Sequence, residues 1–289
     1  MAALELAARA KVNLGLRVGA LRPDGFHDIV TTIVPISLAD AVQVRLTRRG
    51  ITVRTDRPDL PTDEDNLAGR AARAFLTAVK STDGCRVRIR KRIPVEAGLG
   101  GGSADAAAVL LGLNRLHGTP LSGSALRRVG ARVSSDVPAL LAGGPCVARG
   151  RGERIRPIRL PRLRLLLHLP GFGVSTAWAY RRLDTLRRDG RALTTPPLSP
   201  KILRSLLEKQ ESAGLARQLG NSFEPVVFRR YPALGRVRDT LLRSGCAAAA
   251  LSGSGSTVYG LMADDPVRGQ DPMAAMARAG FPCIATGTL

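Results

Sequence analysis

Aromatic residues are scarce in this chain, at 3% of its 289 residues, so a packed core must consist mainly of leucine, valine, isoleucine and alanine. The chain is long enough for two domains of ordinary size. No apolar run approaches the length of a membrane span, and Glu5 and Arg9 interrupt the apolar start, which argues against a signal peptide. We therefore expect a cytoplasmic protein that contacts no membrane.

Closely spaced cysteines are also missing. The four cysteines, Cys85, Cys146, Cys246 and Cys283, lie far apart and form no Cys-x-x-Cys pair. This spacing argues against a zinc site and against a disulfide framework. We expect four reduced thiols.

Acidic residues and lysines are few. The chain has 44 basic and 23 acidic residues, a formal charge of +21, and only five of the basic residues are lysine. Nucleic-acid binding, affinity for anionic substrates and an arginine-rich genome can each produce such a bias. Because the arginines are scattered over all segments with few aromatics among them, we favour the genomic explanation and expect no nucleic-acid partner. The positive field would still attract anionic nucleotides.

Glycine is concentrated in one place. The stretch from Pro94 to Ala107 holds four glycines in the five positions 98–102. Upstream, residues 86–90 alternate as a half-exposed strand does, and downstream the apolar residues recur at helical spacing as far as Leu116. A strand, a glycine-rich turn and a helix N-terminus aim several N–H groups at one point. The stretch therefore predicts an anion site, with phosphate as the usual anion.

Three common phosphate motifs do not fit this stretch. A P-loop ends on Gly-Lys-Ser/Thr, and no lysine lies between Lys91 and Lys201. A dinucleotide fingerprint needs an acid about twenty residues further on, and none lies between Asp105 and Asp136. The His-Arg-Asp and Asp-Phe-Gly strings of protein kinases are absent. A turn that only packs a helix against a sheet stays open, but this many glycines at a helix start favour phosphate.

Residues 94–107 resemble the ATP-loop motif Pro-x-x-x-Gly-Leu-Gly-Ser-Ser-Ala of the GHMP small-molecule kinases, and the Gly-Gly-Gly-Ser form is similar to that of the diphosphocytidyl-methylerythritol kinases. The resemblance runs from residue 9 to residue 261. It implies a two-domain α+β fold with a cleft between the halves. The N-terminal domain, residues 1–156, would be ribosomal-protein-S5-domain-2-like, and the C-terminal domain, residues 157–289, a ferredoxin-like α/β-plait. Residues 157–161 have the composition of a link between them.

The same resemblance implies an activity. It is the ATP-dependent phosphorylation of the 2-hydroxyl of 4-(cytidine 5′-diphospho)-2-C-methyl-D-erythritol, giving the 2-phosphate and ADP in the non-mevalonate isoprenoid pathway. The implied cofactors are ATP and Mg²⁺, and the ion would keep several waters and bind mainly to the phosphates. We expect a monomer or a weak homodimer. Two alternatives stay open: another GHMP kinase, acting on mevalonate, homoserine or a sugar, and a basic RNA-binding protein.

The nucleotide is predicted to bind on the glycine loop, whose N–H groups would cradle the ATP phosphates. By the resemblance, Asn66, at the start of a helix expected through Val79, lies near the adenine, and Ser103 is a candidate hydroxyl near Mg²⁺. The ATP-binding set is Asn66, Pro94, Gly98, Leu99, Gly100, Gly101, Gly102, Ser103 and Ala104.

Two short motifs are candidates for the catalytic residues. Residues 9–18 alternate as a strand with one buried face, and Lys11 and Asn13 share the other face, which on pattern alone is solvated. The string Ala-Lys-Val-Asn-Leu-Gly-Leu resembles the family's first motif, in which the lysine supports catalysis and the asparagine contacts substrate. Residues 134–138, Ser-Ser-Asp-Val-Pro, are similar to Gly-Ala-Asp-Val-Pro. The resemblance implies that Asp136 is the base and that Lys11 pairs with it.

The acceptor site is predicted from two further motifs. Phe26 and His27 follow a turn signal at residues 22–25, where the family has Asp-Gly-Tyr-His-Glu. Phe26 keeps a stacking face and loses the hydroxyl. Residues 173–176 are similar to the family's Gly-Val-Ser-Thr loop, and Tyr180 has the spacing of the aromatic that completes a cytosine sandwich with Phe26, while His27 reads the base edge. The implied substrate set is Asn13, Phe26, His27, Asp136, Thr176 and Tyr180.

A second Gly/Ser turn, residues 251–260, lies between an alanine-rich segment and a predicted strand and resembles the superfamily's third motif. Residues 221–226 resemble the family's Asn-x-Phe-Glu-Pro. The donors of the second turn can serve a phosphate or can brace the first glycine loop. Both roles stay open.

Overall fold

The computed structural model describes residues 3–189, 199–209, 211–263 and 271–289. Its first sheet is built from β1 (Ala3–Leu21), β2 (His27–Thr47), β3 (Ile51–Thr55), β4 (Gly84–Arg90), β5 (Cys146–Gly150) and β6 (Arg154–Pro157). The strand order is β3-β4-β2-β5-β6, and β1 pairs with β2. Neighbouring strands are antiparallel except for the parallel pair β3–β4.

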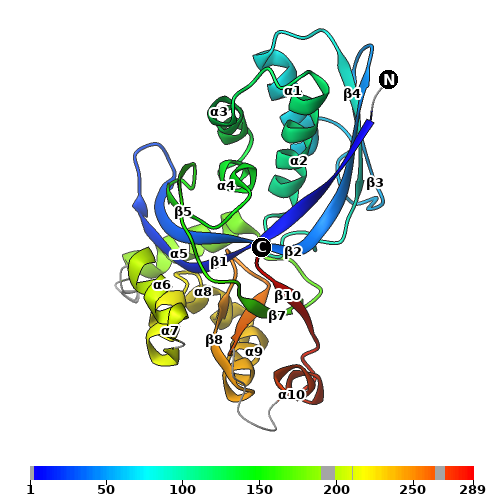
Figure 1. The fold of residues 1–289 in the computed structure, drawn as a ribbon. Coiled ribbons are helices and arrows are strands. Elements are labelled where there is room, and N and C mark those ends of the chain that lie inside the picture. Colours follow the sequence, from blue (N-terminus) through cyan, green and yellow to red (C-terminus); the bar gives the residue numbers. More distant parts are fainter. Residues whose placement is uncertain (1–2, 190–198, 210, 264–270) are drawn as a thin grey trace.

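The helices of the first half are α1 (Leu67–Ala78), α2 (Gly101–Leu116), α3 (Gly123–Val133) and α4 (Val137–Ala142). Helices α1, α2 and α4 contact the sheet, whereas α3 packs on these helices (Figure 1). The helices expected after Asn66, after the glycine loop and through Val133 are confirmed. Asn66 begins α1 by accepting a hydrogen bond from the Ala68 N–H, as a helix N-cap does. Helix α2 begins inside the glycine loop itself, directly after Gly100.

The strands β1 and β2 are long, at 19 and 21 residues, and they run from the first sheet toward the second half of the molecule (Figure 1). The expected strand at residues 9–18 is confirmed, but both of its faces are buried from Ala10 to Val18. The face that carries Lys11 and Asn13, which the alternation alone predicts to be solvated, is covered by the second half of the molecule. Leu16 donates its N–H to the Gly220 carbonyl at 3.1 Å and accepts the Ser222 N–H at 2.9 Å.

The second sheet has the strand order β10-β7-β9-β8 and is fully antiparallel. Its strands are β7 (Arg164–His168), β8 (Cys246–Leu251), β9 (Val258–Met262) and β10 (Cys283–Gly287). Read across the sheet, its strands are the fourth, first, third and second of the four in chain order. This is the order of a ferredoxin-like plait, so the expected C-terminal fold is confirmed. The helices of this half are α5 (Thr176–Arg188), α6 (Pro200–Glu208), α7 (Ser212–Leu219), α8 (Glu224–Arg230), α9 (Pro232–Arg243) and α10 (Pro272–Arg278).

The passage from one sheet to the other lies between β6 and β7. Strand β6 ends at Pro157, one residue beyond the predicted boundary, and β7 begins at Arg164. The division into residues 1–156 and 157–289 stays a prediction, with the two sheets as its support. The hydrophobic core does not divide in the same way, because one cluster of buried side chains includes Leu14 and Phe75 of the first half and Leu165 and Tyr259 of the second.

The cysteines are free, with Cys85, Cys146 and Cys246 buried and Cys283 partly exposed, so the absence of a disulfide framework is confirmed. Burial raises the pKa of each of these thiols to about 11, which keeps them protonated and unreactive near neutral pH. Within the described ranges, none of the helices has the length and hydropathy needed to cross a bilayer.

Candidate active site

A cleft of about 1110 Å³ opens between the two halves, and most of the predicted site residues line it. They come from six segments: β1, the turn into the start of β2, the residue before α1, the glycine loop with the residues leading into it, the residues before α4, and the start of α5. The predicted residues that line the cleft are Lys11, Asn13, Phe26, His27, Asn66, Pro94, Gly98, Gly100, Gly101, Gly102, Ser103, Asp136, Thr176 and Tyr180.

Two predicted ATP residues, Leu99 and Ala104, turn away from the cleft. Their side chains are 1% and 2% exposed and belong to the main hydrophobic cluster. The loop is tightly curved, so its apolar side chains point inward while its glycines face the cleft. Leu99 acts through its backbone instead, because its carbonyl accepts the Lys11 N–H at 3.0 Å and ties the loop to β1.

The glycine loop presents free backbone donors to the cleft. Gly98 and Gly100 have φ of +75° and +69°, which favours glycine over any other residue. The first intrahelical hydrogen bond of α2 runs from Ala104 N to Gly100 O at 2.8 Å. The N–H groups of residues 101–103 precede that bond, so they lie at the positive end of the helix dipole, where an anion binds.

The second Gly/Ser turn braces this loop. Ser252 Oγ donates to Gly98 O at 3.0 Å, and Thr257 N donates to Ala97 O at 3.1 Å. Asn221 holds the turn in place, since its Nδ2 donates to the carbonyls of Leu251 at 2.8 Å and Gly253 at 2.7 Å. Of the two roles left open by the sequence, these contacts support bracing, although residues 253–254 also line the cleft.

Lys11 and Asp136 meet under the glycine loop. The Lys11 side chain is buried, and its Nζ donates to Asn13 Oδ1 at 2.6 Å and to Gly98 O at 3.2 Å. The same Nζ lies 3.5 Å from Asp136 Oδ2. A Cβ on Gly100 would come within 2.9 Å of Lys11 Cε, so the glycine leaves the lysine its space. The predicted pair is therefore assembled from strand β1 and the residues before α4.

The Asp136 carboxylate stays available for chemistry. It stands at the N-cap position of α4, but its side chain makes no capping hydrogen bond, and it is 31% exposed to the cleft. Asn13 is aligned by its neighbours, because its Nδ2 donates to Thr31 Oγ1 at 3.0 Å and leaves Oδ1 to accept from Lys11. The arrangement brings a carboxylate and an ammonium group to one side of the predicted phosphate site.

Ser103 lies on the first turn of α2 and lines the cleft. Its Oγ is 2.9 Å from the Oγ of Ser134, the residue where the chain departs from the family's glycine. The departure thus supplies a hydroxyl that positions Ser103. This contact was not anticipated from the sequence.

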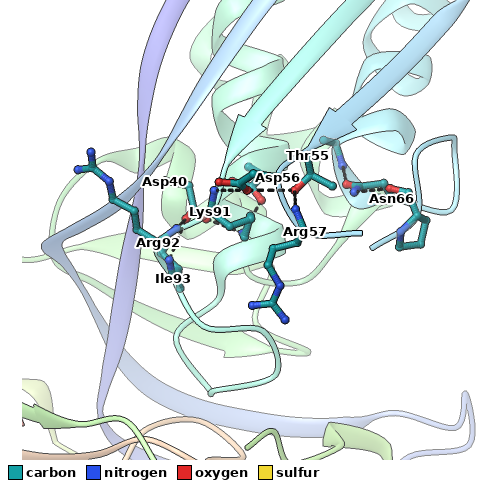
Figure 2. A network of polar contacts seen from close by, with 11 residues as sticks. Asp40, Thr55, Asp56, Arg57, Asn66, Lys91, Arg92 and Ile93 are labelled. Atoms are coloured by element: carbon teal, nitrogen blue, oxygen red, sulfur yellow. Dashed lines mark hydrogen bonds and ion pairs between the residues drawn. The ribbon is translucent and has the colours of Figure 1, made fainter. Parts of the chain in front are cut away.

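Asn66 borders the cleft, but its side chain is engaged in structure. Its Oδ1 accepts from Ala68 N at 3.0 Å and its Nδ2 donates to Pro61 O at 2.9 Å, as Figure 2 shows at one end of the polar network. Leu67, the next residue, packs beside Gly102, whose Cβ would lie 3.2 Å from a Leu67 methyl group. The start of α1 and the glycine loop therefore form adjoining walls.

A buried lysine with two carboxylates lies beneath the loop, and sequence reasoning missed it. Lys91 Nζ is 2.5 Å from Asp40 Oδ2 and 2.7 Å from Asp105 Oδ2. Asp40 also accepts the N–H groups of Arg92 and Ile93 through Oδ1 (Figure 2). The signal in the sequence was Asp105 itself, an acid in an otherwise apolar helical stretch.

Asp105 is the less satisfied of these two carboxylates. Its Oδ1 has no hydrogen-bond partner among the described residues. Burial raises the pKa of Asp105 to about 7, with Lys91 opposing the rise and Asp40 adding to it. Lys91 and Asp105 both reach the cleft wall.

At the end of the cleft where a cytosine sandwich is predicted, His27 stacks on Tyr180, with ring centroids 4.9 Å apart and planes at 24°. The sandwich of Phe26 and Tyr180 stays a prediction. Tyr180 also meets the edge of Phe223 at 4.9 Å. Phe26 stands at the mouth, 47% exposed, with the Arg151 guanidinium 4.5 Å above its ring. Burial raises the pKa of Tyr180 to about 12.

Thr176 begins α5 and contacts the second Gly/Ser turn through Ser254, with 2.9 Å between the hydroxyl oxygens. Ser175 caps the helix by accepting the Trp178 N–H.

The sequence did not single out Arg151 or Asp184, although both line the cleft. Asp184 is four residues beyond Tyr180, which puts both side chains on one face of a helix.

Comparisons with known proteins identify the family of this chain. The family model described as GHMP kinases N terminal domain matches residues 66–144, and the one described as GHMP kinases C terminal matches residues 203–278. The chain is 42% identical over 268 residues to a 4-diphosphocytidyl-2-C-methyl-D-erythritol kinase of Synechococcus sp. (strain JA-2-3B'a(2-13)), with 91% of this chain and 86% of that protein covered. It is 40% identical over 264 residues to the kinase of the same name from Pelotomaculum thermopropionicum, covering 89% and 88%.

Solved structures are similar over nearly the whole chain. A crystal structure of 4-(cytidine 5'-diphospho)-2C-methyl-D-erythritol kinase superposes with a TM-score of 0.78 at 35% identity and covers 99% of both chains. Homoserine kinase from Cytophaga hutchinsonii superposes with a TM-score of 0.72 at 19% identity, covering 99% of this chain and 94% of that one. The second likeness shows the fold alone.

Proposed function

This chain belongs to the 4-diphosphocytidyl-2-C-methyl-D-erythritol kinases of the GHMP kinase family, and from that premise we propose how its residues carry out the transfer. The enzyme uses ATP to phosphorylate 4-(cytidine 5′-diphospho)-2-C-methyl-D-erythritol in the non-mevalonate isoprenoid pathway. The observation that carries the mechanism is the 3.5 Å contact between Lys11 Nζ and Asp136 Oδ2 beside the glycine loop.

The glycine loop holds the ATP phosphates through the N–H groups of residues 101–103. Asp136 accepts the proton of the acceptor's 2-hydroxyl, and the resulting oxygen forms a bond to the γ-phosphorus while the bond to the β–γ bridging oxygen breaks. ADP leaves with the electron pair of that bond. Lys11 stabilises the negative charge that grows on the transferring group, because its ammonium is fixed by Asn13 and Gly98 O and needs no rearrangement.

We also propose that Mg²⁺ binds together with ATP and has few protein ligands. The described residues hold no cluster of three histidine, cysteine, aspartate or glutamate side chains that could bind a metal by themselves. An ion bound mainly through ATP phosphates and waters fits such a site, since Mg²⁺ commonly takes only one or two protein ligands. We assign Ser103 Oγ as a protein contact. When bound, the ion would neutralise charge on the β- and γ-phosphates.

The acceptor binds at the other end of the cleft. Phe26 offers an exposed ring face for the cytosine, and the stacked pair of His27 and Tyr180 forms a second wall. Thr176 and Asn13 also line the cleft and serve as further polar contacts to the acceptor. Arg151 adds positive charge where the acceptor carries its diphosphate. The binding of small anionic substrates explains the positive charge at this end of the cleft, so no nucleic-acid partner is needed to explain it. The cytoplasmic location and a monomeric or weakly dimeric state stay predictions.

The test is ADP release with Mg-ATP across four acceptors: the cytidyl-diphospho-methylerythritol, CDP, mevalonate and homoserine. We expect turnover with the first alone. Turnover with mevalonate or homoserine would keep the Lys11–Asp136 roles and overturn the acceptor pocket. No turnover with any acceptor in folded protein, together with RNA binding beyond counterion release, would favour the RNA-binding alternative.

A further inference from the structure

One face of helix α5 forms part of the cleft wall. The residues of α5 that line the cleft recur at helical spacing, and they are Thr176, Ala177, Tyr180, Arg181 and Asp184. The next residue, Arg182, is exposed but does not line the cleft, because it is rotated by about 100° around the helix axis. Helix α5 therefore brings one arginine to the cleft and keeps its neighbour away from it.

The Arg181 guanidinium has no protein partner among the described residues. It makes no ion pair and no side-chain hydrogen bond there, and only its backbone carbonyl is engaged, by the Thr185 hydroxyl at 3.0 Å. Asp184, the acid on the same helix face, instead has its Oδ2 3.3 Å from His27 Nε2. The exposed guanidinium is thus available to a ligand in the cleft.

The other cations of the cleft differ in whether a carboxylate neutralises them. Lys11 and Lys91 each contact a carboxylate. Arg151, in the turn between β5 and β6, lies over the Phe26 ring and has no carboxylate at ion-pair distance in the part of the chain that the structure describes. Arg151 and Arg181 are therefore the two cleft cations without an anionic partner there, and each half of the molecule supplies one.

The cleft carries acids as well as cations. Its lining includes five carboxylates, those of Asp65, Glu96, Asp105, Asp136 and Asp184. A general positive field therefore does not hold an anion in this cleft. An anionic acceptor needs direct contacts with cations that no carboxylate neutralises.

We propose that Arg181 binds the diphosphate of the acceptor together with Arg151, and that the two arginines select a nucleoside diphosphate at this end of the cleft. Each phosphoryl group of that diphosphate carries a negative charge and presents oxygens that match the planar fork of a guanidinium. The predicted base pocket adjoins both arginines, since Arg151 lies over Phe26 and Arg181 follows Tyr180 on α5. The proposal deepens the proposed function and rests on it for the position of the cytosine.

Binding to the free enzyme tests the contact without turnover. CDP carries a diphosphate and cytidine does not, so calorimetric titration with each compound separates the diphosphate from the base. We expect Arg181→Gln to weaken CDP binding about tenfold, the size expected for one lost hydrogen bond between charged groups, and to leave cytidine binding unchanged. The matched control is Arg182→Gln, which removes the same charge one position away and should change neither affinity.

Kinetics test whether the contact is made with the acceptor. In Arg181→Gln we expect the KM for the cytidine acceptor to rise about tenfold, while kcat and the KM for ATP stay unchanged. Arg181→Lys should restore part of the acceptor affinity, because lysine keeps the charge and lacks the fork. Rising salt should narrow the difference in CDP affinity between the wild type and Arg181→Gln, since salt screens an exposed ionic contact.

The possible failures are distinguishable. Unchanged CDP affinity in folded Arg181→Gln overturns the proposal. An equal loss of CDP and cytidine affinity also overturns it, because the arginine would then act on the base pocket, and an equal effect of Arg182→Gln would assign the loss to net charge alone. If CDP binding falls as expected but no cytidine acceptor is phosphorylated, the diphosphate contact stands and the proposed function fails.

Discussion

The carbonyl oxygen of Ser252 lies where Gly98 has no side chain, 2.0 Å from the position of an ideal Cβ on that glycine. The loop of the first half and the turn of the second half are therefore in backbone-to-backbone contact. Gly98 also has φ of +75°, so two separate physical constraints favour glycine at this position.

The first prediction uses this contact. Gly98→Ala should lower the free energy of unfolding by more than about 4 kcal/mol and abolish ATP binding, because backbone must move to make room. Gly143→Ala is the control, since Gly143 has φ of +73° and nothing within 4 Å of its Cβ position. It should lose only about 1–2 kcal/mol from the left-handed backbone. Urea denaturation measures both, and equal losses would contradict the contact argument.

The second prediction concerns Asp136. Asp136→Asn keeps the shape of the side chain and removes the base, so turnover should fall to background while acceptor affinity, measured by calorimetry, stays within a few-fold. Because Asp136 makes no capping hydrogen bond, the stability of α4 should not change. A variant with near-normal turnover would show that another group accepts the proton.

The third prediction concerns the charge of Lys11. Lys11→Met keeps the buried stem and removes the ammonium, so kcat should fall by about 10²–10³, the usual effect of removing one fixed electrostatic contact to a transition state. The exposed Lys201 of α6 gives a matched control, and Lys201→Met should leave kcat unchanged. A larger effect on the KM for ATP than on kcat would instead assign Lys11 to ground-state binding.

The fourth prediction is a pH dependence of stability. Burial raises the pKa of Asp105 to about 7 and that of Glu224 to about 7 as well. Between pH 4 and pH 7 the folded protein therefore binds protons that the unfolded chain has released, so these two groups make stability fall as pH rises. Above pH 7 their effect levels off.

Variants separate the two contributions. Asp105→Asn and Glu224→Gln should each make the slope of the urea midpoint against pH shallower over this window, and the double variant should flatten it further. The comparison uses the slopes of the urea midpoint against pH and not the midpoints themselves, because Asp105→Asn also lowers overall stability through its lost contact with Lys91. A slope unchanged in Asp105→Asn would show that this carboxyl is ionised throughout the window.

The fifth prediction concerns Arg151. Its guanidinium lies 4.5 Å above the Phe26 ring at the cleft, so Arg151→Gln should raise the acceptor KM about fivefold and leave kcat unchanged. Arg154 follows in the same hairpin but is 70% exposed, and Arg154→Gln should have no effect. If rising salt removes the difference between wild type and Arg151→Gln, the contact is electrostatic, whereas an effect independent of salt would assign Arg151 to packing on Phe26.

Local patterns predicted much of this fold and site. The alternation at residues 9–18, the glycine run before α2 and the helix after Asn66 each have a short-range physical cause, and each was found where expected. The burial of Lys11 and Asn13 could not be predicted in this way. It arises because Ser252 and Tyr259 approach from the second half, and Tyr259 donates its hydroxyl to the Asn13 carbonyl across 246 positions of sequence.

Other details have the same origin. Leu99 and Ala104 belong to a motif predicted to bind phosphate, but the motif does not indicate which side chains face inward, and the side chains of these two are buried in the main hydrophobic cluster. The pairing of Tyr180 with Phe26 across a base stays a prediction, but the sequence did not indicate that His27 stacks on Tyr180 or that Asp184, one turn along α5, lies 3.3 Å from His27 Nε2. Such side-chain arrangements depend on contacts with several residues that are distant in the sequence, so a local sequence pattern cannot predict them.

The brace on the glycine loop has a consequence for how the enzyme is made. Ser252, which donates to Gly98 O, lies 154 positions further along the chain. A ribosome completes the nucleotide loop long before it adds the residues that hold that loop in shape. We therefore expect the nascent chain to gain the braced loop only after residue 257 has emerged, and ATP to give the first half no protection from unfolding before then.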